Sequence, residues 1–294
     1  MNHAKAYSRR EALIALSALA ASSAVPTLAS AQTLNYPLWE ITSGAGKVYL
    51  LAHTPPRRRT WSDPRIEQLL RGCRVLWTET QHRDEPPSQE LIKRYVMDTS
   101  GTLQRRLTAR DRERLIASAK AARVPLGSLD ALQPWAAGET LESSFFEEIG
   151  PTQNAAQVLY AKATAAGIAT SSEFAAAGDV MRWFAALSED VQVEYLRYIM
   201  DEVLQGTSAG QRIYEAWAIG DSGPADAWVA RMKATYPNLY PSIVLERNRA
   251  WVSRITSMLT KKKPSMVVVG LYHLAGPDRL QSLLAQSGLT IRRG

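Results

Sequence analysis

The sequence predicts an α/β protein with a mixed central sheet that is built from both chain ends and carries a large helical insertion. Strand-like apolar segments occur near residues 38–52 and 74–79, and again at 266–269. Between about residues 88 and 263 the apolar residues recur at helical spacing instead. The strand–helix–strand order over residues 266–291 indicates a crossover unit, which favours some parallel pairing.

Composition excludes several classes of protein. The chain has 294 residues, of which 46% are hydrophobic, enough to bury the core of one domain with an insertion. Its one cysteine, Cys73, excludes an intrachain disulfide framework and a thiolate-cluster metal site. The 35 Lys and Arg against 28 Asp and Glu give a net charge of +7, which is modest and by itself does not indicate nucleic acid.

Residues 1–31 have the pattern of a signal peptide. Arg9-Arg10 precede an apolar run over residues 12–25, and Ala29-Ser30-Ala31 form a small-x-small cleavage site. The twin arginine favours the Tat route, with Sec export as the alternative. The apolar run is shorter than the roughly 20 residues that span a bilayer. We therefore expect a domain over 32–294 with no membrane span, located in the periplasm or secreted.

Local signals place the individual elements. Residues 38–42 and 48–52 flank a Gly-rich loop and predict a β-hairpin. Asp63-Pro64 predict the start of a helix that ends at Gly72, and a further strand follows over 74–79. Later helix boundaries are indicated by Thr108 with Asp111, Asn154, Gly167, Ser188, the turn at 220–224, Pro277-Asp278 and Gly288, and residues 289–291 predict a last strand.

Three candidate polar residues follow predicted strands. His53, Glu79 and His273 each come directly after an apolar segment. Ligand sites in open α/β sheets gather beyond the carboxyl ends of the strands, so these residues could share one site. Imidazole and carboxylate together suit Zn, Mn, Fe or Co. The alternative is that each is a polar residue at a point where the chain reaches the surface.

Arg247 lies in an apolar helical stripe. Val244, Arg247, Trp251, Ile255 and Met258 fall at spacings of three and four and share one helix face. An arginine buried there needs a partner, because an unpaired buried charge is costly. Glu79 or a bound anion could serve. In the alternative interpretation the stem packs against the core while the guanidinium reaches solvent.

The motifs at the two ends of the chain resemble those of the TraB/PrgY/GumN family. Residues 270–278 resemble its closing GxxH-L-x-G motif, and Arg247-Asn248 resemble its RN pair. Ala216-Trp217 with Gly220-Asp221 resemble its aW-x-x-GD segment. Residues 37–39 and 48–51 resemble its opening strands. Glu79 resembles its strand-end glutamate, and Glu173 resembles a later glutamate.

The resemblance implies a site chemistry. The family and its TIKI relatives are similar to metal-dependent proteases, with two GxxH motifs and a strand-end glutamate. This implies that Glu79, Arg247 and His273 are catalytic, that His53, Glu79 and His273 bind a divalent metal (Mn, Zn, Fe or Co), and that Asn248 contacts ligand. A bound metal lowers the pKa of its water.

The first GxxH motif departs from the family pattern. It falls on Ala52-His53-Thr54-Pro55, so that alanine replaces glycine and proline replaces histidine. His53 lies two residues earlier, on the same strand face and about 6.5 Å back along the chain. His53 either substitutes for the missing ligand or is a remnant in a protein that has lost its metal.

Two functions follow. The first is an exported metal-dependent hydrolase that is peptidase-like. The second is a catalytically inactive family member that binds an envelope peptide or an anionic polysaccharide, with Arg57 and Arg58 at the rim of the site. Those arginines could equally belong to a solvated loop, as we expect for His82. The sequence contains no phosphate-binding loop, G-x-S-x-G or H-E-x-x-H motif.

Overall fold

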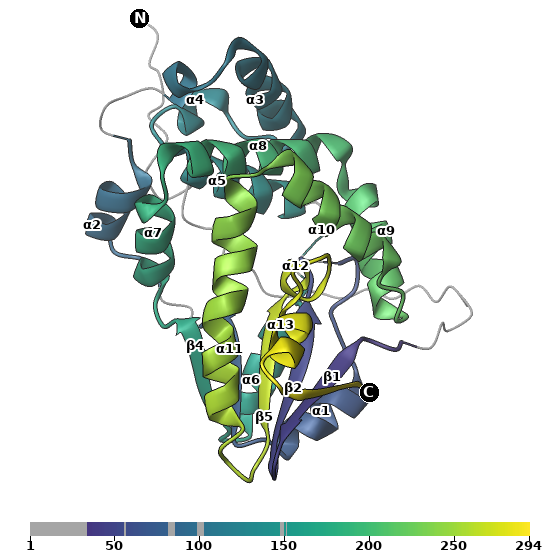
Figure 1. Cartoon of the computed structure of the whole chain (residues 1–294). Coiled ribbons are helices and arrows are strands. Elements are labelled where there is room, and N and C mark those ends of the chain that lie inside the picture. The colour runs from purple at the N-terminus through teal and green to yellow at the C-terminus, as the bar shows by residue number, and fades with distance from the viewer. Residues whose placement is uncertain (1–33, 56, 82–85, 99–102, 148–149, 151) are drawn as a thin grey trace, which may run out of the picture.

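The fold is a three-layer α/β/α arrangement beneath a group of helices (Figure 1). The structure is a computed structural model, and it describes residues 34–55, 57–81, 86–98, 103–147, 150 and 152–294. The predicted signal peptide lies outside the described residues, and so does His82. Among the described residues, no helix is long and apolar enough to cross a membrane.

The six-stranded sheet has the order β4-β3-β5-β2-β1-β6. Neighbours from β4 to β2 are parallel, whereas β1 pairs antiparallel with both β2 and β6. This confirms a mixed sheet assembled from both chain ends. The strands are β1 (Leu38–Ser43), β2 (Gly46–His53), β3 (Val75–Thr80), β4 (Ala169–Phe174), β5 (Ser265–Gly270) and β6 (Thr290–Arg293).

The predicted hairpin is confirmed, and its two glycines, Gly44 and Gly46, are needed for different reasons. Gly44 has a φ of 56°, which the tight turn requires and which L side chains rarely adopt. Gly46 pairs with Ser43, and a Cβ there would overlap the backbone of Leu259. The hairpin therefore fits closely under the end of the helix that precedes β5.

Two details of the sheet lie beyond what the sequence predicts. The helical insertion also contributes one strand, β4, which pairs with β3 at the sheet edge. Its sequence ATSSEF lacks the apolar alternation that predicts strands, since all six residues keep some exposure at the edge. The last strand, β6, joins only β1, so the crossover from β5 skips two strands.

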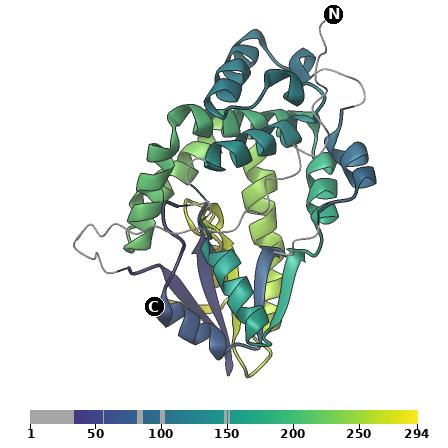
Figure 2. The same cartoon turned by 180° about the vertical axis from the view of Figure 1, so that it is seen from behind.

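Two helices cover each face of the sheet. The helices α1 (Pro64–Arg71) and α6 (Ala155–Ala165) lie on one face, seen in Figure 2, and α11 (Glu246–Met258) and α13 (Leu280–Gln286) lie on the other. The predicted caps of α1 and α6 are confirmed: Asp63 accepts from two backbone N–H groups, and Asn154 forms a capping box. The last helix begins at Leu280, two residues after the predicted Pro277-Asp278 start.

The remaining helices form a canopy above the carboxyl ends of the parallel strands (Figures 1 and 2). The predicted starts at Thr108 and Ser188 are confirmed, because both side chains accept from backbone N–H groups. The canopy and its connections comprise α2 (Gln89–Leu91), η2 (Ile92–Val96), η3 (Leu103–Arg106), α3 (Ala109–Ala121), α4 (Leu126–Leu129), α5 (Pro134–Glu147), α7 (Ala177–Ala186), α8 (Glu189–Gln205), α9 (Thr207–Ala218), α10 (Gly223–Thr235), η4 (Pro241–Leu245) and α12 (Leu271–Leu274).

Candidate functional site

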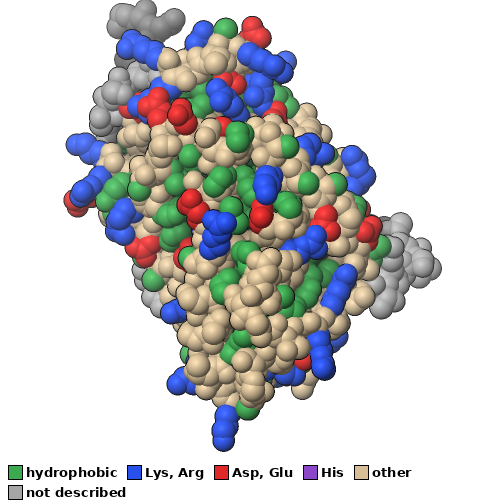
Figure 3. Space-filling view, viewed as in Figure 1, with side chains coloured by type: hydrophobic (Ala, Val, Ile, Leu, Met, Phe, Trp, Pro, Cys, Tyr) green, Lys and Arg blue, Asp and Glu red, His purple; other side chains and the backbone are tan. Residues whose placement is uncertain are grey.

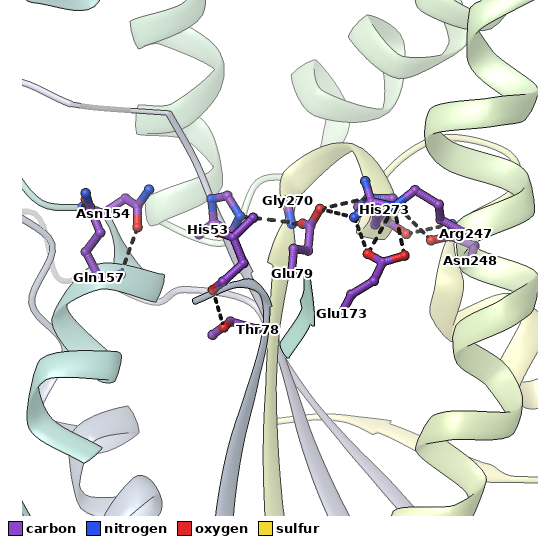
Figure 4. A network of polar contacts seen from close by, with 11 residues as sticks. His53, Thr78, Glu79, Asn154, Gln157, Glu173, Arg247, Asn248, Gly270 and His273 are labelled. Carbon is purple, nitrogen blue, oxygen red and sulfur yellow. Dashed lines mark hydrogen bonds and ion pairs between the residues drawn. The ribbon is translucent and has the colours of Figure 1, made fainter. Parts of the chain in front are cut away.

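The parallel strands deliver three groups to one point under the canopy (Figure 4). His53 ends β2 and pairs in register with Gly270, which ends β5, while Glu79 lies near the end of β3. The short helix α12 then returns His273 to the same place. The predicted meeting of Glu79 with His273 and His53 is therefore what the structure shows.

Glu79 is the centre of the cluster. Its Oε1 accepts from the backbone N–H of Gly270, and its Oε2 accepts from Arg247 Nη2 at 2.6 Å. His53 Nε2 lies 3.5 Å from Oε1, and His273 Nε2 lies 3.6 Å from Oε2. These last two separations are too long for good hydrogen bonds, so each carboxylate oxygen faces an imidazole nitrogen across a small gap.

Arg247 joins two carboxylates from neighbouring strands. Besides Glu79, it contacts Glu173 of β4 through Nη2 at 2.5 Å and Nε at 3.2 Å. The rings of Phe174, Trp183 and Trp251 lie 4.8–5.5 Å from its guanidinium carbon. The guanidinium is thus buried and paired, which is the first of the two interpretations of the helical stripe, and it does not reach solvent.

The charge of Arg247 fixes the ionisation of Glu79. Burial alone raises the pKa of a carboxyl, but the guanidinium of Arg247, and then His273, outweigh it and hold the pKa of Glu79 well below its usual value. Burial lowers the pKa of Arg247, but the negative charge of Glu79 raises it, and the net effect is a raised pKa. At neutral pH the pair is therefore a carboxylate and a guanidinium.

Asn248 sets the tautomer of His273. Its Nδ2 donates to the backbone carbonyls of His273 at 3.2 Å and Asp278 at 2.9 Å, which orients the amide. Its Oδ1 then accepts from His273 Nδ1 at 2.7 Å. The proton of the neutral imidazole is accordingly assigned to Nδ1, and Nε2 carries a lone pair.

His273 is kept neutral and unpartnered at Nε2. It is fully buried between Trp251 and Tyr272, with ring centroids 4.3 and 4.5 Å away. Burial lowers its pKa to about 4, although the charge of Glu79 opposes that shift. Its Nε2 has no hydrogen-bond partner among the described residues. A buried lone pair without a donor indicates a place for a ligand.

Comparison with known proteins agrees with this architecture. The model of the TraB/PrgY/gumN family matches residues 37–293, which is most of the chain. The chain belongs to the TraB/PrgY/gumN family. No curated protein and no solved structure gives a significant match.

The closing motif of this TraB/PrgY/gumN family member builds one wall of the site. Gly270 approaches Glu79 so closely that a Cβ there would lie 3.2 Å from Oε1 and 3.0 Å from the ring of Tyr272. Any larger residue would push the carboxylate away from its backbone donor. The first and last residues of the GxxH motif thus act together, because Gly270 holds Glu79 and His273 faces it.

The altered opening motif still places an imidazole in the site. His53 is partly exposed, with 26% of its side chain accessible, and its Nε2 faces Glu79 (Figure 4). Its Nδ1 has no hydrogen-bond partner among the described residues. His53 therefore occupies a position from which it can serve in place of the histidine that Pro55 has replaced.

The donor set suits a divalent metal by its chemistry. His273 offers a buried lone pair, Glu79 is ionised, and His53 faces the same carboxylate; metals bind these deprotonated forms. In the described part of the chain, no three His, Cys, Asp or Glu side chains already surround one point closely enough to hold an ion. The three residues therefore fit such an ion by the chemistry of their donor atoms.

Asn248, Arg57 and Arg58, which the sequence predicts to bind ligand, have other contacts in this structure. Asn248 is fully buried, and its amide is engaged by His273 and Asp278, so it positions His273. Arg57 donates to the hydroxyl of Tyr36 and lies over its ring. Arg58 is exposed. Neither arginine has a contact with Glu79 or His273 in the described structure.

Glu173 is the site residue that sequence reasoning places least well. It resembles the family's later glutamate, but its strand has a polar sequence that predicts no sheet. The signal that could have found it is the need of Arg247 for a second partner, since one guanidinium can bind two carboxylates.

Proposed function

We propose that this protein is an exported, peptidase-like hydrolase whose centre is Glu79, His273 and Arg247, with His53 completing the site. The observation that carries the proposal is the buried, ionised carboxylate of Glu79, whose two oxygens each face an imidazole Nε2. Buried polar groups left in this state are typical of functional sites, because a purely structural pair would close its hydrogen bonds.

The low pKa values of Glu79 and His273 favour one role over another. A carboxylate that binds protons weakly is a poor general base, and so is an imidazole with a pKa of about 4. Both groups do keep the lone pairs that metal binding requires. A divalent ion (Mn, Zn, Fe or Co) held by His53, Glu79 and His273 would polarise a carbonyl and lower the pKa of water.

The chain's own residues keep this arrangement ready. Asn248 directs the lone pair of His273 toward Glu79, and the N–H of Gly270 fixes Oε1. Arg247 holds Glu79 ionised while Glu173 holds Arg247. The guanidinium also supplies positive charge beside the reacting group, where charge develops in acyl transfer.

The expected place of action is the cell envelope. The twin-arginine leader over residues 1–31 supports export to the periplasm or the exterior. The substrates proposed are therefore envelope peptides.

Lys and Arg are dispersed over the face of the molecule shown in Figure 3, and no histidine is visible there, in agreement with the burial of His273.

A second candidate is a silent relative that binds an envelope ligand without cleaving it. The observation in its favour is Pro55 at the position of the family histidine, together with a guanidinium already compensated by two carboxylates. Such a protein would use the same site for binding only.

Metal analysis of the purified mature protein separates the two. After loading with Mn, Zn, Fe or Co, the hydrolase proposal expects stoichiometric metal in the unaltered protein and in Glu147→Gln, whose carboxylate is exposed on α5. His273→Ala should lose the metal while keeping the fold by circular dichroism. Absence of metal under every loading condition would contradict the metal-dependent proposal and favour the silent relative.

A further inference from the structure

We propose that the substrate carries a cationic group, a lysine or arginine side chain, that binds an acidic, tyrosine-lined wall of the canopy beside Glu79 and His273. This inference rests on the proposed function and names its substrate class. The wall consists of three canopy carboxylates and four tyrosines: Glu139, Glu142 and Glu202 with Tyr195, Tyr198, Tyr214 and Tyr272.

The wall forms where two canopy helices meet. On α5, Glu139 and Glu142 are three residues apart and share a face, as Tyr195, Tyr198 and Glu202 do on α8. The hydroxyl of Tyr195 donates to Glu139 Oε1, which places these two faces against each other. The canopy carboxylates and Tyr198 all keep partial exposure, so a ligand can reach them.

Two more helices close the wall. Trp228 of α10 donates from Nε1 to Glu202 Oε1 at 3.3 Å. Tyr214 of α9 is buried, and the charges of Glu202 and then Glu142 add to the effect of burial in raising its pKa. The wall thus combines carboxylates with neutral phenols from α5, α8 and α9.

Tyr272 connects the wall to the strand-end site. Its ring packs on His273 with centroids 4.5 Å apart and lies beside the space that Gly270 leaves open. Tyr272 also lies close enough to the wall to add to the raised pKa values of Tyr195 and Tyr198 on α8. One partly exposed phenol therefore lies beside both the strand-end site and the canopy.

An independent feature indicates that a ligand enters this space. His273 Nε2 is fully buried, has no hydrogen-bond partner among the described residues, and faces Glu79 next to Tyr272. A group bound there would have its neighbouring part against the canopy. The strand-end site and the wall are in this sense two halves of one binding region.

The chemistry of the wall selects a cation. Among the described residues, no Lys or Arg forms an ion pair with Glu139, Glu142 or Glu202, although Arg114 and Arg197 pair with other carboxylates of the canopy. Burial, and then Glu139 and Glu202, raise the pKa of Glu142 to about 8, whereas Arg231 lowers the pKa of Glu202 without forming an ion pair with it. An ammonium or guanidinium group would relieve that repulsion and bind the tyrosine faces. An anionic polysaccharide would be repelled.

Binding of three tripeptides to the full mature protein tests this inference. Isothermal titration at pH 9, where Glu142 is ionised and lysine side chains are still charged, should give tighter binding of tri-lysine than of tri-alanine, with tri-glutamate weakest. In Glu139→Gln/Glu142→Gln the affinity for tri-lysine should fall about tenfold or more, as loss of a charge-assisted contact predicts. The control Glu147→Gln, an exposed site on the same helix, should bind as the unaltered protein does.

Equal affinities for the three tripeptides would overturn the inference. So would an affinity for tri-lysine that is the same in the double variant as in the unaltered protein.

Casein hydrolysis tests the proposed function separately. Cleavage with no preference for bonds near Lys or Arg removes the inference and leaves the hydrolase. Selective tri-lysine binding without cleavage of any peptide removes the hydrolase and leaves a cation-binding relative. Because both substitutions are nearly isosteric, folding is checked by the melting transition alone.

Discussion

Two carboxyl groups in this protein, one buried and one partly exposed, have pKa values shifted in opposite directions. Glu79, at the strand ends, has a pKa well below the usual value, whereas Glu142, in the canopy, has a pKa raised to about 8. Burial opposes ionisation in both. Arg247 lies 2.6 Å from Glu79, while Glu142 has other carboxylates as neighbours. The comparison teaches that burial makes ionisation of a carboxyl group costly, and that the neighbouring charges decide whether its pKa lies above or below the usual value.

The two regions consequently complement each other. The charges of the strand-end site are already compensated internally by Arg247, and His273 Nε2 there has no hydrogen-bond partner among the described residues. Glu139 and Glu142 form no ion pair with a Lys or Arg among the described residues, and we expect them to obtain a cation from a ligand. A substrate that brings a cation would then make the whole region electrically balanced.

Removal of Arg247 should have the largest effect. Arg247→Met leaves Glu79 and Glu173 buried without their cation, and the loss of one partner of a buried pair costs about 3–5 kcal/mol. The free energy of unfolding from urea titration should fall by that amount. Adding Glu79→Gln and Glu173→Gln should recover most of it. A single variant as stable as the unaltered protein would show that the guanidinium is not needed by these carboxylates.

Substitution of Glu142 should have the next largest effect and the opposite sign. Its folded pKa of about 8 exceeds the ordinary 4.5, so the native state binds more protons than the unfolded state between these values. The stability therefore falls as pH rises from about 4.5 to about 8. Glu142→Gln should remove this slope and be more stable at pH 9 by a few kcal/mol, at roughly 1.4 kcal/mol per pKa unit.

Thermal unfolding at pH 5 and pH 9 measures this slope. The exposed Glu147→Gln serves as the control and should keep the pH dependence of the unaltered protein. If Glu142→Gln retained the same slope, the canopy carboxylates would have to be neutralised by something other than a proton.

Loss of Asn248 should weaken function more than folding. Without its Oδ1, His273 loses the acceptor that fixes its tautomer, and outer-shell partners of this kind typically contribute 10–100-fold to metal affinity or activity. Asn248→Ala should reduce the metal affinity by about that factor. Nitrogen NMR of the His273 ring should show a mixture of tautomers. An unchanged ring spectrum would contradict the positioning role.

The smallest effects are expected at the arginine pair. Arg58 is exposed, so Arg58→Ala should change the free energy of unfolding by no more than about 0.5 kcal/mol. Arg57 donates to Tyr36, and Arg57→Ala should cost about 1 kcal/mol. Urea titration of the two variants measures this difference. Equal losses would show that the Tyr36 contact has no role in stability.

The sequence predicted what local rules determine. Caps such as Asp63 and Asn154 act within three residues, and the strand-end positions of Glu79 and His273 follow from apolar runs. The edge strand β4 was not predicted, because its pairing with β3, and not its own composition, makes this segment a strand. The position of Glu142 beside other carboxylates was not predicted for a related reason. Helical spacing does not reveal whether a partly exposed glutamate faces solvent or another carboxylate.

Casein hydrolysis by the mature protein, compared with Glu79→Gln, tests the central claim most directly. Glutamine keeps the size of the side chain and its place beside Gly270 but removes the negative charge that faces both imidazoles. We expect cleavage by the unaltered protein and by Glu147→Gln, and none by Glu79→Gln. Equal cleavage by all three proteins would contradict a hydrolytic role for the Glu79 centre.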